Sequence, residues 1–220
     1  MMGFSKPSIL PLICIVVSLV LVLLTFFLPW YSTGITGGDV EMNANIYLDR
    51  SEMKFLGQTV KSSNEGVDFI QNTMYLTIIT FIVCIIALIG TMGFVIKSGF
   101  SDKMKKIGIA FGIITCIFAV ITIIYYMSET INVISESSST YFAISGQENI
   151  FTDIGFWWSE DIGGAHISAG PGFSWYFMIF SGILAFVSSV ILIIKKEPKQ
   201  TTPLSPSMES QAPPVSPPMQ

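Results

Sequence analysis

Four long stretches without a charged side chain constrain this chain more than any other feature of its sequence. Residues 9–30, 74–96, 107–127 and 173–194 contain no Asp, Glu, Lys, Arg or His. A helix of about 20 apolar residues spans the roughly 30 Å hydrocarbon core of a bilayer, so each stretch is long enough to cross it. A single charge at the centre of such a helix would cost about 2.5–3.5 kcal/mol on insertion. We therefore predict an integral membrane protein that crosses the bilayer four times.

The basic residues indicate how the chain is oriented. Eight of the 11 Lys and Arg residues lie before residue 9, between residues 97 and 106, or after residue 194. Because positive residues near helix ends are retained in the cytoplasm, we expect both termini and the short connection there. The two long connections, 31–73 and 128–172, hold 12 of the 15 acidic residues and are expected outside. The sequence thus predicts a multi-pass protein of the cell membrane, embedded in its lipid bilayer, with an acidic exported surface.

The two long connections are predicted to fold together into a small antiparallel sheet. Residues 40–48 alternate apolar and polar side chains, which is the pattern of a half-buried strand. Residues 55–60 are expected to form a second strand, interrupted by Gly57, and residues 140–144 and 150–154 two short ones. Glycines between residues 163 and 172 predict irregular chain leading into the fourth helix. The expected fold is of the all-α membrane class, a four-helix transmembrane bundle capped outside by this sheet.

The chain beside the third and fourth stretches differs in composition. Residues 128–136 lack turn signals, so the third helix is expected to project beyond the membrane. Residues 197–220 are rich in Pro, Ser, Thr and Gln and cannot bury a core, which predicts a disordered cytoplasmic tail. The sequence thus divides into a four-span membrane domain, residues 1–196, and this tail.

Small residues recur at helical spacing within the apolar stretches. The third stretch contains Gly108 and Gly112, the second Gly90 and Gly93, and the fourth Ala185. Small side chains let helix backbones approach closely in lipid, where no hydrophobic drive brings helices together. We interpret these five residues as helix-packing positions within one bundle. Contact between two copies in a homo-oligomer is the alternative.

An aromatic and acidic segment stands out in the second long connection. Trp157 and Trp158 are followed by Glu160 and Asp161, with no basic residue in the segment. The two rings have three interpretations: the core of the exported domain, an anchor in the lipid headgroups, or a protein-binding surface, since Trp is enriched at binding hot spots. We take these four residues as the candidate partner-binding site.

The residue types that carry chemistry do not form a recognisable set. Cys14, Cys84 and Cys116 lie inside the apolar stretches, where we interpret them as small apolar packing residues. The single histidine, His166, has no nearby nitrogen or sulfur residue to complete a metal site and is interpreted as a solvated loop residue. Neither a nucleophile with its base nor a phosphate-binding loop is visible. We expect no enzymatic activity, no cofactor, no metal and no nucleic-acid partner.

The layout as a whole resembles a known group of membrane proteins. Four spans, inside termini, a strand-forming first loop and Trp30 just after the first helix resemble the claudin and peripheral-myelin-protein type of four-span protein, and similar four-span proteins of unknown role occur in prokaryotes. The first loop carries neither the Gly-Leu-Trp motif nor the cysteine pair of claudins, so the resemblance implies the architecture alone.

The expected function follows from these observations. We predict a non-enzymatic scaffold or accessory subunit that binds a protein partner through its acidic exported loops. The alternative is a transporter or channel component. The absence of an ionisable residue from the four stretches argues against that alternative, because such residues usually mark ion and proton paths.

Overall fold

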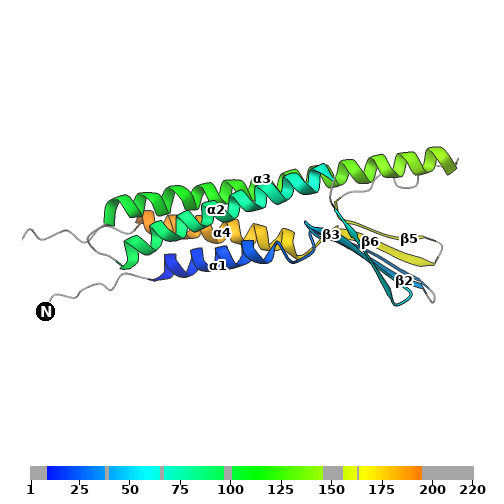
Figure 1. Cartoon of the computed structure of the whole chain (residues 1–220), viewed down its shortest axis with the longest axis horizontal. Helices are drawn as coiled ribbons and strands as arrows, with labels where there is room; N and C mark the ends of the chain where they lie inside the picture. Colours follow the sequence, from blue (N-terminus) through cyan, green and yellow to red (C-terminus); the bar gives the residue numbers. More distant parts are fainter. Residues whose placement is uncertain are drawn as a thin grey trace, which may run out of the picture.

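The computed structural model describes residues 9–37, 40–64, 67–96, 101–145, 156–162 and 164–194 of the 220-residue chain. This part of the chain forms a group of helices at one end and an antiparallel sheet at the other (Figure 1). The helices are α1 (Leu10–Leu24), α2 (Asp68–Ile96), α3 (Ser101–Ser145) and α4 (Phe173–Ile194).

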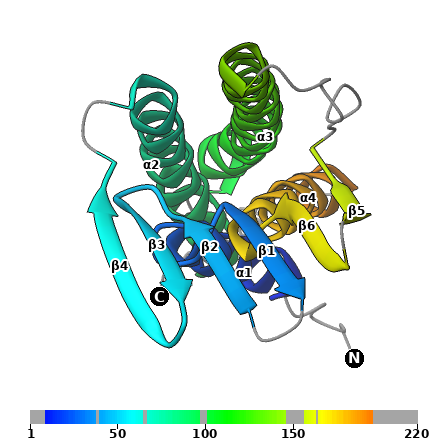
Figure 2. The same cartoon turned by 90° about the vertical axis from the view of Figure 1, so that its right-hand side faces the viewer.

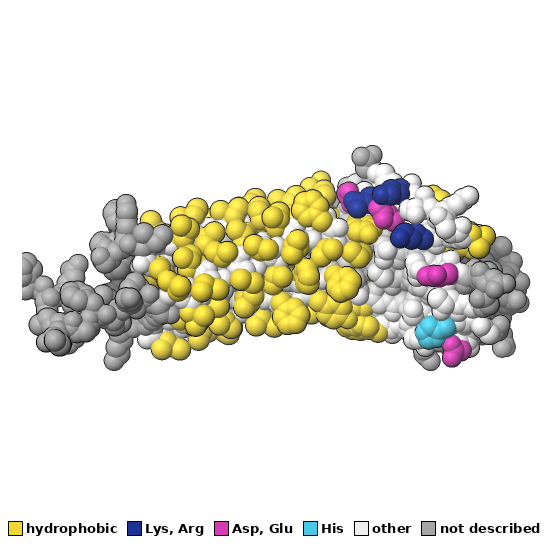
Figure 3. Space-filling view, turned by 90° about the horizontal axis from the view of Figure 1, so that it is seen from below, with side chains coloured by type: hydrophobic (Ala, Val, Ile, Leu, Met, Phe, Trp, Pro, Cys, Tyr) yellow, Lys and Arg dark blue, Asp and Glu magenta, His cyan; other side chains and the backbone are white. Residues whose placement is uncertain are grey.

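Three of these helices are long and apolar enough to cross a membrane. The qualifying segments are Asp68–Val95, Asp102–Val133 and Phe173–Ile194. The remaining helix, α1, is also apolar but has 15 residues, which corresponds to about 22 Å of helix. Hydrophobic side chains cover the helical part of the molecule on the face that Figure 3 shows. An apolar surface of this extent requires lipid rather than water around it, so the helical part has the properties of a membrane protein.

The helices pack around one another through small and hydroxyl-bearing residues. α1 contacts α2 and α4, and α3 contacts the same two helices. The Ser18 hydroxyl on α1 donates to the Ser181 carbonyl on α4 at 2.9 Å. Farther along the same pair, the Ser188 hydroxyl donates to the Pro11 carbonyl at 2.9 Å. Bonds of this kind hold helices together in lipid, where apolar burial contributes little.

The glycines singled out in the sequence lie where helices of the same chain meet. A Cβ atom added at Gly90 of α2 would lie 2.5 Å from the backbone nitrogen of Gly108 on α3. One added at Gly112 would collide with the Ser189 hydroxyl of α4 and lie 3.1 Å from the Ala185 carbonyl. A Cβ at Gly93 would lie 2.9 Å from Met104 Cγ. Each of these glycines therefore lies at a helix contact that is this close because the glycine has no side chain.

The sheet has six strands. They come from both long connections, as predicted from the sequence. Its strand order is β4-β3-β2-β1-β6-β5, with every neighbouring pair antiparallel. Because β1 pairs with β6, the first connection is joined to the second through the middle of the sheet. The strands are β1 (Tyr31–Gly37), β2 (Val40–Ile46), β3 (Arg50–Phe55), β4 (Gln58–Ser63), β5 (Trp158–Ile162) and β6 (Ala165–Pro171).

The strand expected over residues 55–60, with its interruption at Gly57, is found as parts of two strands that meet at a turn. β3 ends at Phe55, and Leu56 and Gly57 form a tight turn before β4. Both turn residues have positive φ, 48° at Leu56 and 76° at Gly57. Two successive residues of this kind match the right-handed twist of the flanking strands, and glycine adopts such a conformation without a steric penalty.

The second connection also differs from its expected structure. Residues 140–144 are helical rather than extended, because α3 continues to Ser145. No Gly or Pro occurs between Gly112 and Gly146 to end this helix. The third helix therefore continues past residue 127, as expected, and is longer than expected. Residues 150–154 lie outside the described part of the chain. The glycine-containing chain before α4 is not irregular but forms the β5–β6 hairpin.

An aromatic cluster joins the sheet to the helices. The Trp30 and Tyr126 rings lie 5.0 Å apart, Tyr31 and Phe156 5.5 Å, and Phe156 and Trp175 5.8 Å, measured between centroids. Burial raises the pKa of Tyr31 to about 12. The Tyr31 hydroxyl has no hydrogen-bond partner in the described part of the chain. Ring packing holds the sheet in place together with backbone bonds, such as that from the Trp30 amide to the Ile46 carbonyl at 2.7 Å.

Candidate binding surface on the sheet

The two faces of the sheet differ in chemistry because side chains alternate along each strand. One row of cross-strand neighbours consists of Thr33, Ala44, Met53 and Val60, and the next row begins with Ile35. These rows lie on the face that carries Tyr31 and Ile46, which pack into the aromatic cluster beside α3. We call this side the apolar face. Figures 1 and 2 show that it is turned toward the side of the sheet on which α3 runs.

The opposite side is the polar face. One of its rows consists of Ser32, Asn45, Glu52 and Lys61. Figure 3 views this face and shows charged side chains mainly toward its two edges, with white polar atoms between them. A shallow hollow of about 500 Å³ lies near its centre. The hollow is lined by small and polar residues, including Gly34, Asn43, Lys54 and Ser168.

Among the described residues of the sheet, the most exposed large apolar side chains lie on the β3–β4 hairpin. Met53 is 44% exposed, Phe55 43%, Leu56 65% and Val60 63%. Met53 and Val60 are direct cross-strand partners on the apolar face, and Leu56 is in the turn. We call these four residues the hairpin patch. In water such a patch is unfavourable unless another molecule covers it, so it is a candidate binding surface.

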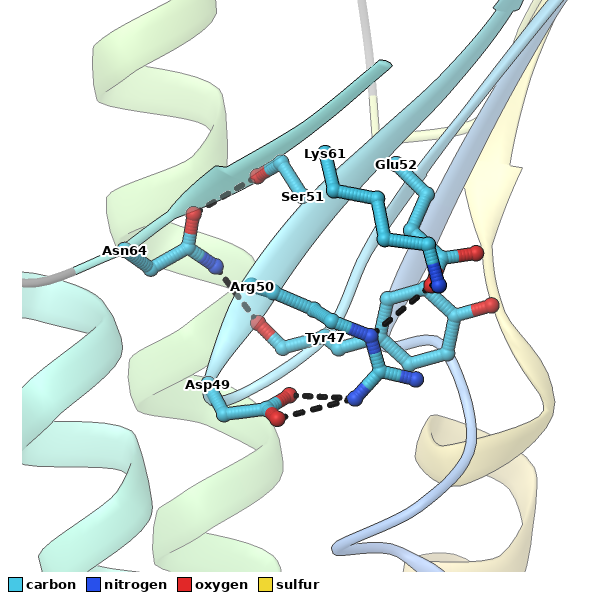
Figure 4. A network of polar contacts seen from close by, with 7 residues as sticks. All are labelled: Tyr47, Asp49, Arg50, Ser51, Glu52, Lys61 and Asn64. Atoms are coloured by element: carbon cyan, nitrogen blue, oxygen red, sulfur yellow. Dashed lines mark hydrogen bonds and ion pairs between the residues drawn. The ribbon is translucent and has the colours of Figure 1, made fainter. Parts of the chain in front are cut away.

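A network of charges fixes the other end of the same hairpin (Figure 4). The Glu52 carboxylate accepts a hydrogen bond from Arg50 Nε at 2.8 Å and is bridged by Lys61 Nζ at 2.9 Å. Hydrogen bonds from Arg50 and Lys61 lower the pKa of Glu52 to about 2. The Arg50 guanidinium also pairs with Asp49 at 2.8 Å and lies 4.4 Å from the centre of the Tyr47 ring. The four charges of this network balance, and together they tie β4 to β3.

An asparagine completes the base of the hairpin, as Figure 4 also shows. Asn64 donates from Nδ2 to the Tyr47 carbonyl at 2.8 Å and accepts from the Ser51 hydroxyl at 2.7 Å. It follows β4 directly and is buried. These bonds hold the start of β3 and the end of β4 in register, so the hairpin patch is presented by a fixed scaffold.

The four partner-binding residues taken from the sequence lie at the opposite edge of the sheet. Trp157 is 54% exposed, and its ring packs edge-on against Trp175 at 5.2 Å and Phe156 at 5.1 Å. Trp158 begins β5 and is half-buried. Glu160 is on the same strand, paired in register with Ile167. Three of these residues therefore lie on β5 and Trp157 comes directly before it, while the buried ring of this segment is Phe156.

The remaining acidic residue of this group has a histidine partner. Asp161 Oδ1 lies 2.8 Å from Nδ1 of His166, whose Nε2 lies 3.3 Å from the Ser159 hydroxyl. All of these side chains are exposed. Among the described residues, no group of three or more His, Cys, Asp or Glu side chains is placed to hold a metal ion.

The hairpin patch was missed in the sequence, although a signal for it exists. Met53 and Phe55 alternate with Glu52 and Lys54, which is the pattern of a two-faced strand. The dipeptide at residues 56–57 ends in Gly and would have marked a turn. Comparison with known proteins found no protein-family model and no curated protein that matches this chain.

Proposed function

We propose that this chain is a four-span protein of the cell membrane that acts as a non-enzymatic scaffold or accessory subunit. In this proposal both termini are cytoplasmic, the sheet is exported, and a protein partner binds there. The observation that carries the proposal is the hairpin patch, with four large apolar side chains that are 43–65% exposed on a strand pair fixed by ion pairs. Large exposed apolar side chains gathered on one surface mark interaction sites.

The fourth span of this proposal is α1. Its helical hydrogen bonding continues past the last assigned residue, since the Leu28 amide donates to the Leu24 carbonyl at 3.2 Å. Val16, Val20 and Phe27 are exposed, so the outer surface of this segment is as apolar as that of α4. With the extra turn, the helical segment extends from residue 10 to residue 28, which is close to the length of a membrane span. With α1 as the fourth span, the proposed layout resembles that of claudin-type four-span proteins.

Several buried hydroxyl groups favour a packed bundle over the alternative of a transporter or channel component. Thr77 donates to the carbonyl four residues earlier at 2.8 Å, as does Thr115. Ser189 donates to the Ile109 carbonyl of a neighbouring helix at 3.2 Å. A hydroxyl group that is bonded to a helix carbonyl is not available to bind a solute. A conduction path is instead lined by groups that can exchange hydrogen-bond partners.

Site-specific photo-crosslinking in cells that carry the protein tests partner binding. A photoreactive residue is placed at Val60 on the apolar face, and at Thr36 of β1 on the polar face, away from the hairpin, as the control. We expect Val60 to yield a discrete protein adduct at least tenfold more abundant than that from Thr36. Met53→Ser should remove the adduct without changing the amount of protein in the membrane. Equal labelling from both positions, or adducts with lipid alone, would contradict the proposal.

A further inference from the structure

β4 is a regular and open edge of the sheet. It pairs with β3 on one side and ends the strand order, and all six of its residues are exposed. The turn before it has two residues, so Phe55 and Gln58 flank the turn as a hydrogen-bonded pair. Because hydrogen bonding alternates along an antiparallel strand, the backbone groups of Thr59 and Lys61 are directed away from β3. These groups form a ladder to which a further strand can bond.

The usual devices that block an open edge are missing from β4. Proteins protect edge strands with proline, with bulges or with a free lysine. Residues 58–63 contain no proline and pair with β3 at six consecutive positions without a bulge. The one lysine of β4, Lys61, is bound to Glu52 at 2.9 Å. The edge is therefore straight, and its charge is already compensated.

We propose that β4 accepts an added strand from an extended segment of a partner protein in which apolar and acidic residues alternate. This inference rests on the proposed function and names the form of its partner. A strand beside β4 would place every second side chain against Val60 and Met53 on the apolar face. The intervening side chains would meet the polar face beside Lys61 and Lys54. Main-chain bonds then supply affinity, and the alternating side chains supply specificity.

The acidic character of the partner follows from the distribution of charge. Residues 31–73 and 128–172 contain three basic residues, Arg50, Lys54 and Lys61, and all three lie on β3 and β4. Figure 3 shows the dark-blue side chains gathered at one edge of the polar face, together with acidic side chains that pair with Arg50 and Lys61. Lys54 forms no ion pair within the described part of the chain, so it is available to a carboxylate of the added strand.

A second copy of this chain fits the edge poorly. If two β4 strands paired antiparallel, the two-fold axis would be perpendicular to the sheet and the helices of the two copies would point in opposite directions. If β5 of a second copy paired with β4, sheet twist would intervene. Neighbouring strands rotate by roughly 20–25°, so six steps turn the second copy by roughly 120–150°. The helices of the second copy could then not cross the same membrane as those of the first. A flexible segment, in contrast, can follow the twist.

Peptide binding to the full-length protein in lipid nanodiscs tests the inference. The probes are three labelled eight-residue peptides: alternating Val and Glu, alternating Val and Lys, and a scrambled Val and Glu sequence. Fluorescence anisotropy should show the Val-Glu peptide binding at least tenfold more tightly than either of the others. Lys54→Glu should reduce that preference at least tenfold, because it reverses a charge that takes part in no ion pair.

A matched pair of variants tests whether the peptide binds the strand edge. Thr59→Pro removes an outward N–H group, whereas Thr59→Ala removes the same side chain and keeps that group. We expect the first variant to lose binding at least tenfold and the second to bind as the parent does. Thermal unfolding verifies that both variants fold.

Three outcomes would overturn the inference. Equal binding to both Thr59 variants would place the peptide elsewhere, and equal binding of the Val-Glu and Val-Lys peptides would remove the charge argument. Self-association that Thr59→Pro abolishes, without peptide binding, would assign the edge to a second copy. If no peptide binds while the Val60 crosslink persists, strand addition fails and the proposed function stands. If the crosslink is also absent, both fail.

Discussion

Glu52 is the residue whose ionisation most directly affects the hairpin. Its folded pKa of about 2 lies below the value of about 4.3 expected for an unfolded Glu, because Arg50 and Lys61 bond to the charged form. A lowered folded pKa gives stability that is present above pH 4.3 and is lost as pH falls toward 2. We expect the protection of the β3 and β4 amides, taken relative to their intrinsic exchange rates, to fall between pH 4.5 and pH 2.5.

Two variants isolate this contribution of Glu52. Glu52→Gln should flatten that part of the pH dependence, because it removes the titrating group. Glu41→Gln is the control, since the Glu41 carboxylate accepts a hydrogen bond from the neutral Asn43 amide at 2.9 Å. Hydrogen–deuterium exchange with mass spectrometry measures both. An unchanged pH profile in Glu52→Gln would show that the ion pairs do not set the stability of the hairpin.

Gly112 makes a second prediction at the scale of single residues. A side chain there would collide with Ser189 and press on the Ala185 carbonyl, so α3 and α4 would have to separate. Overpacking of this kind costs about 1–3 kcal/mol. Gly112→Leu should therefore lower the melting temperature in detergent, while Ile113→Leu on the next position should leave it nearly unchanged. Equal melting temperatures for the two variants would remove close helix approach as the role of Gly112.

At the scale of elements, the turn between β3 and β4 predicts how the hairpin responds to substitution. Gly57 has a φ of 76°, so Gly57→Val should destabilise the hairpin by about 1–2 kcal/mol. Leu56, at a φ of 48°, is strained in the same way, and Leu56→Asn should relieve part of that strain. Amide exchange in β4 should rise in the first variant and fall in the second. Similar exchange in both would mean that the turn does not determine hairpin stability.

The elements that could be predicted from the sequence are those with a strong local pattern. The helices could be located from their uncharged stretches, because burial in lipid excludes charged side chains. β2 could be located from its alternation of apolar and polar residues, because only one face of the strand is buried. β1 and β6 were not found, since Tyr31–Gly37 and Ala165–Pro171 contain glycine, serine and alanine, which have weak strand preference. Pairing with β2 and with each other holds these strands extended, and a single segment does not reveal its future neighbour.

The candidate site was harder to predict than the strands that carry it. Alternation around Met53 indicates that the strand has an apolar face, but not whether another element covers that face. Trp157 and Trp158 were predicted as site residues because of their residue type, but the buried ring of this segment is their neighbour Phe156. Exposure depends on long-range packing, and for this reason the hairpin patch became evident only once the sheet was assembled.

At the scale of the whole molecule, the proposed orientation makes a prediction about access. In a variant without its native cysteines, a cysteine at Ser63 on β4 should react with a membrane-impermeant thiol reagent added to intact cells. A cysteine at Ser101, where α3 begins, should react only after the cells are permeabilised. Mass shift on a gel measures the labelled fraction. Labelling of the second position in sealed cells would mean that the protein is inserted in the opposite direction.

The length of α3 has a mechanical consequence. The helix passes the aromatic cluster at Tyr126 and continues for 19 residues to Ser145, which corresponds to about 28 Å. In the proposed orientation this part of α3 lies outside the bilayer, on one side of the sheet. Because a helix resists compression along its axis, it would limit how closely a second membrane could approach the cell surface at this point.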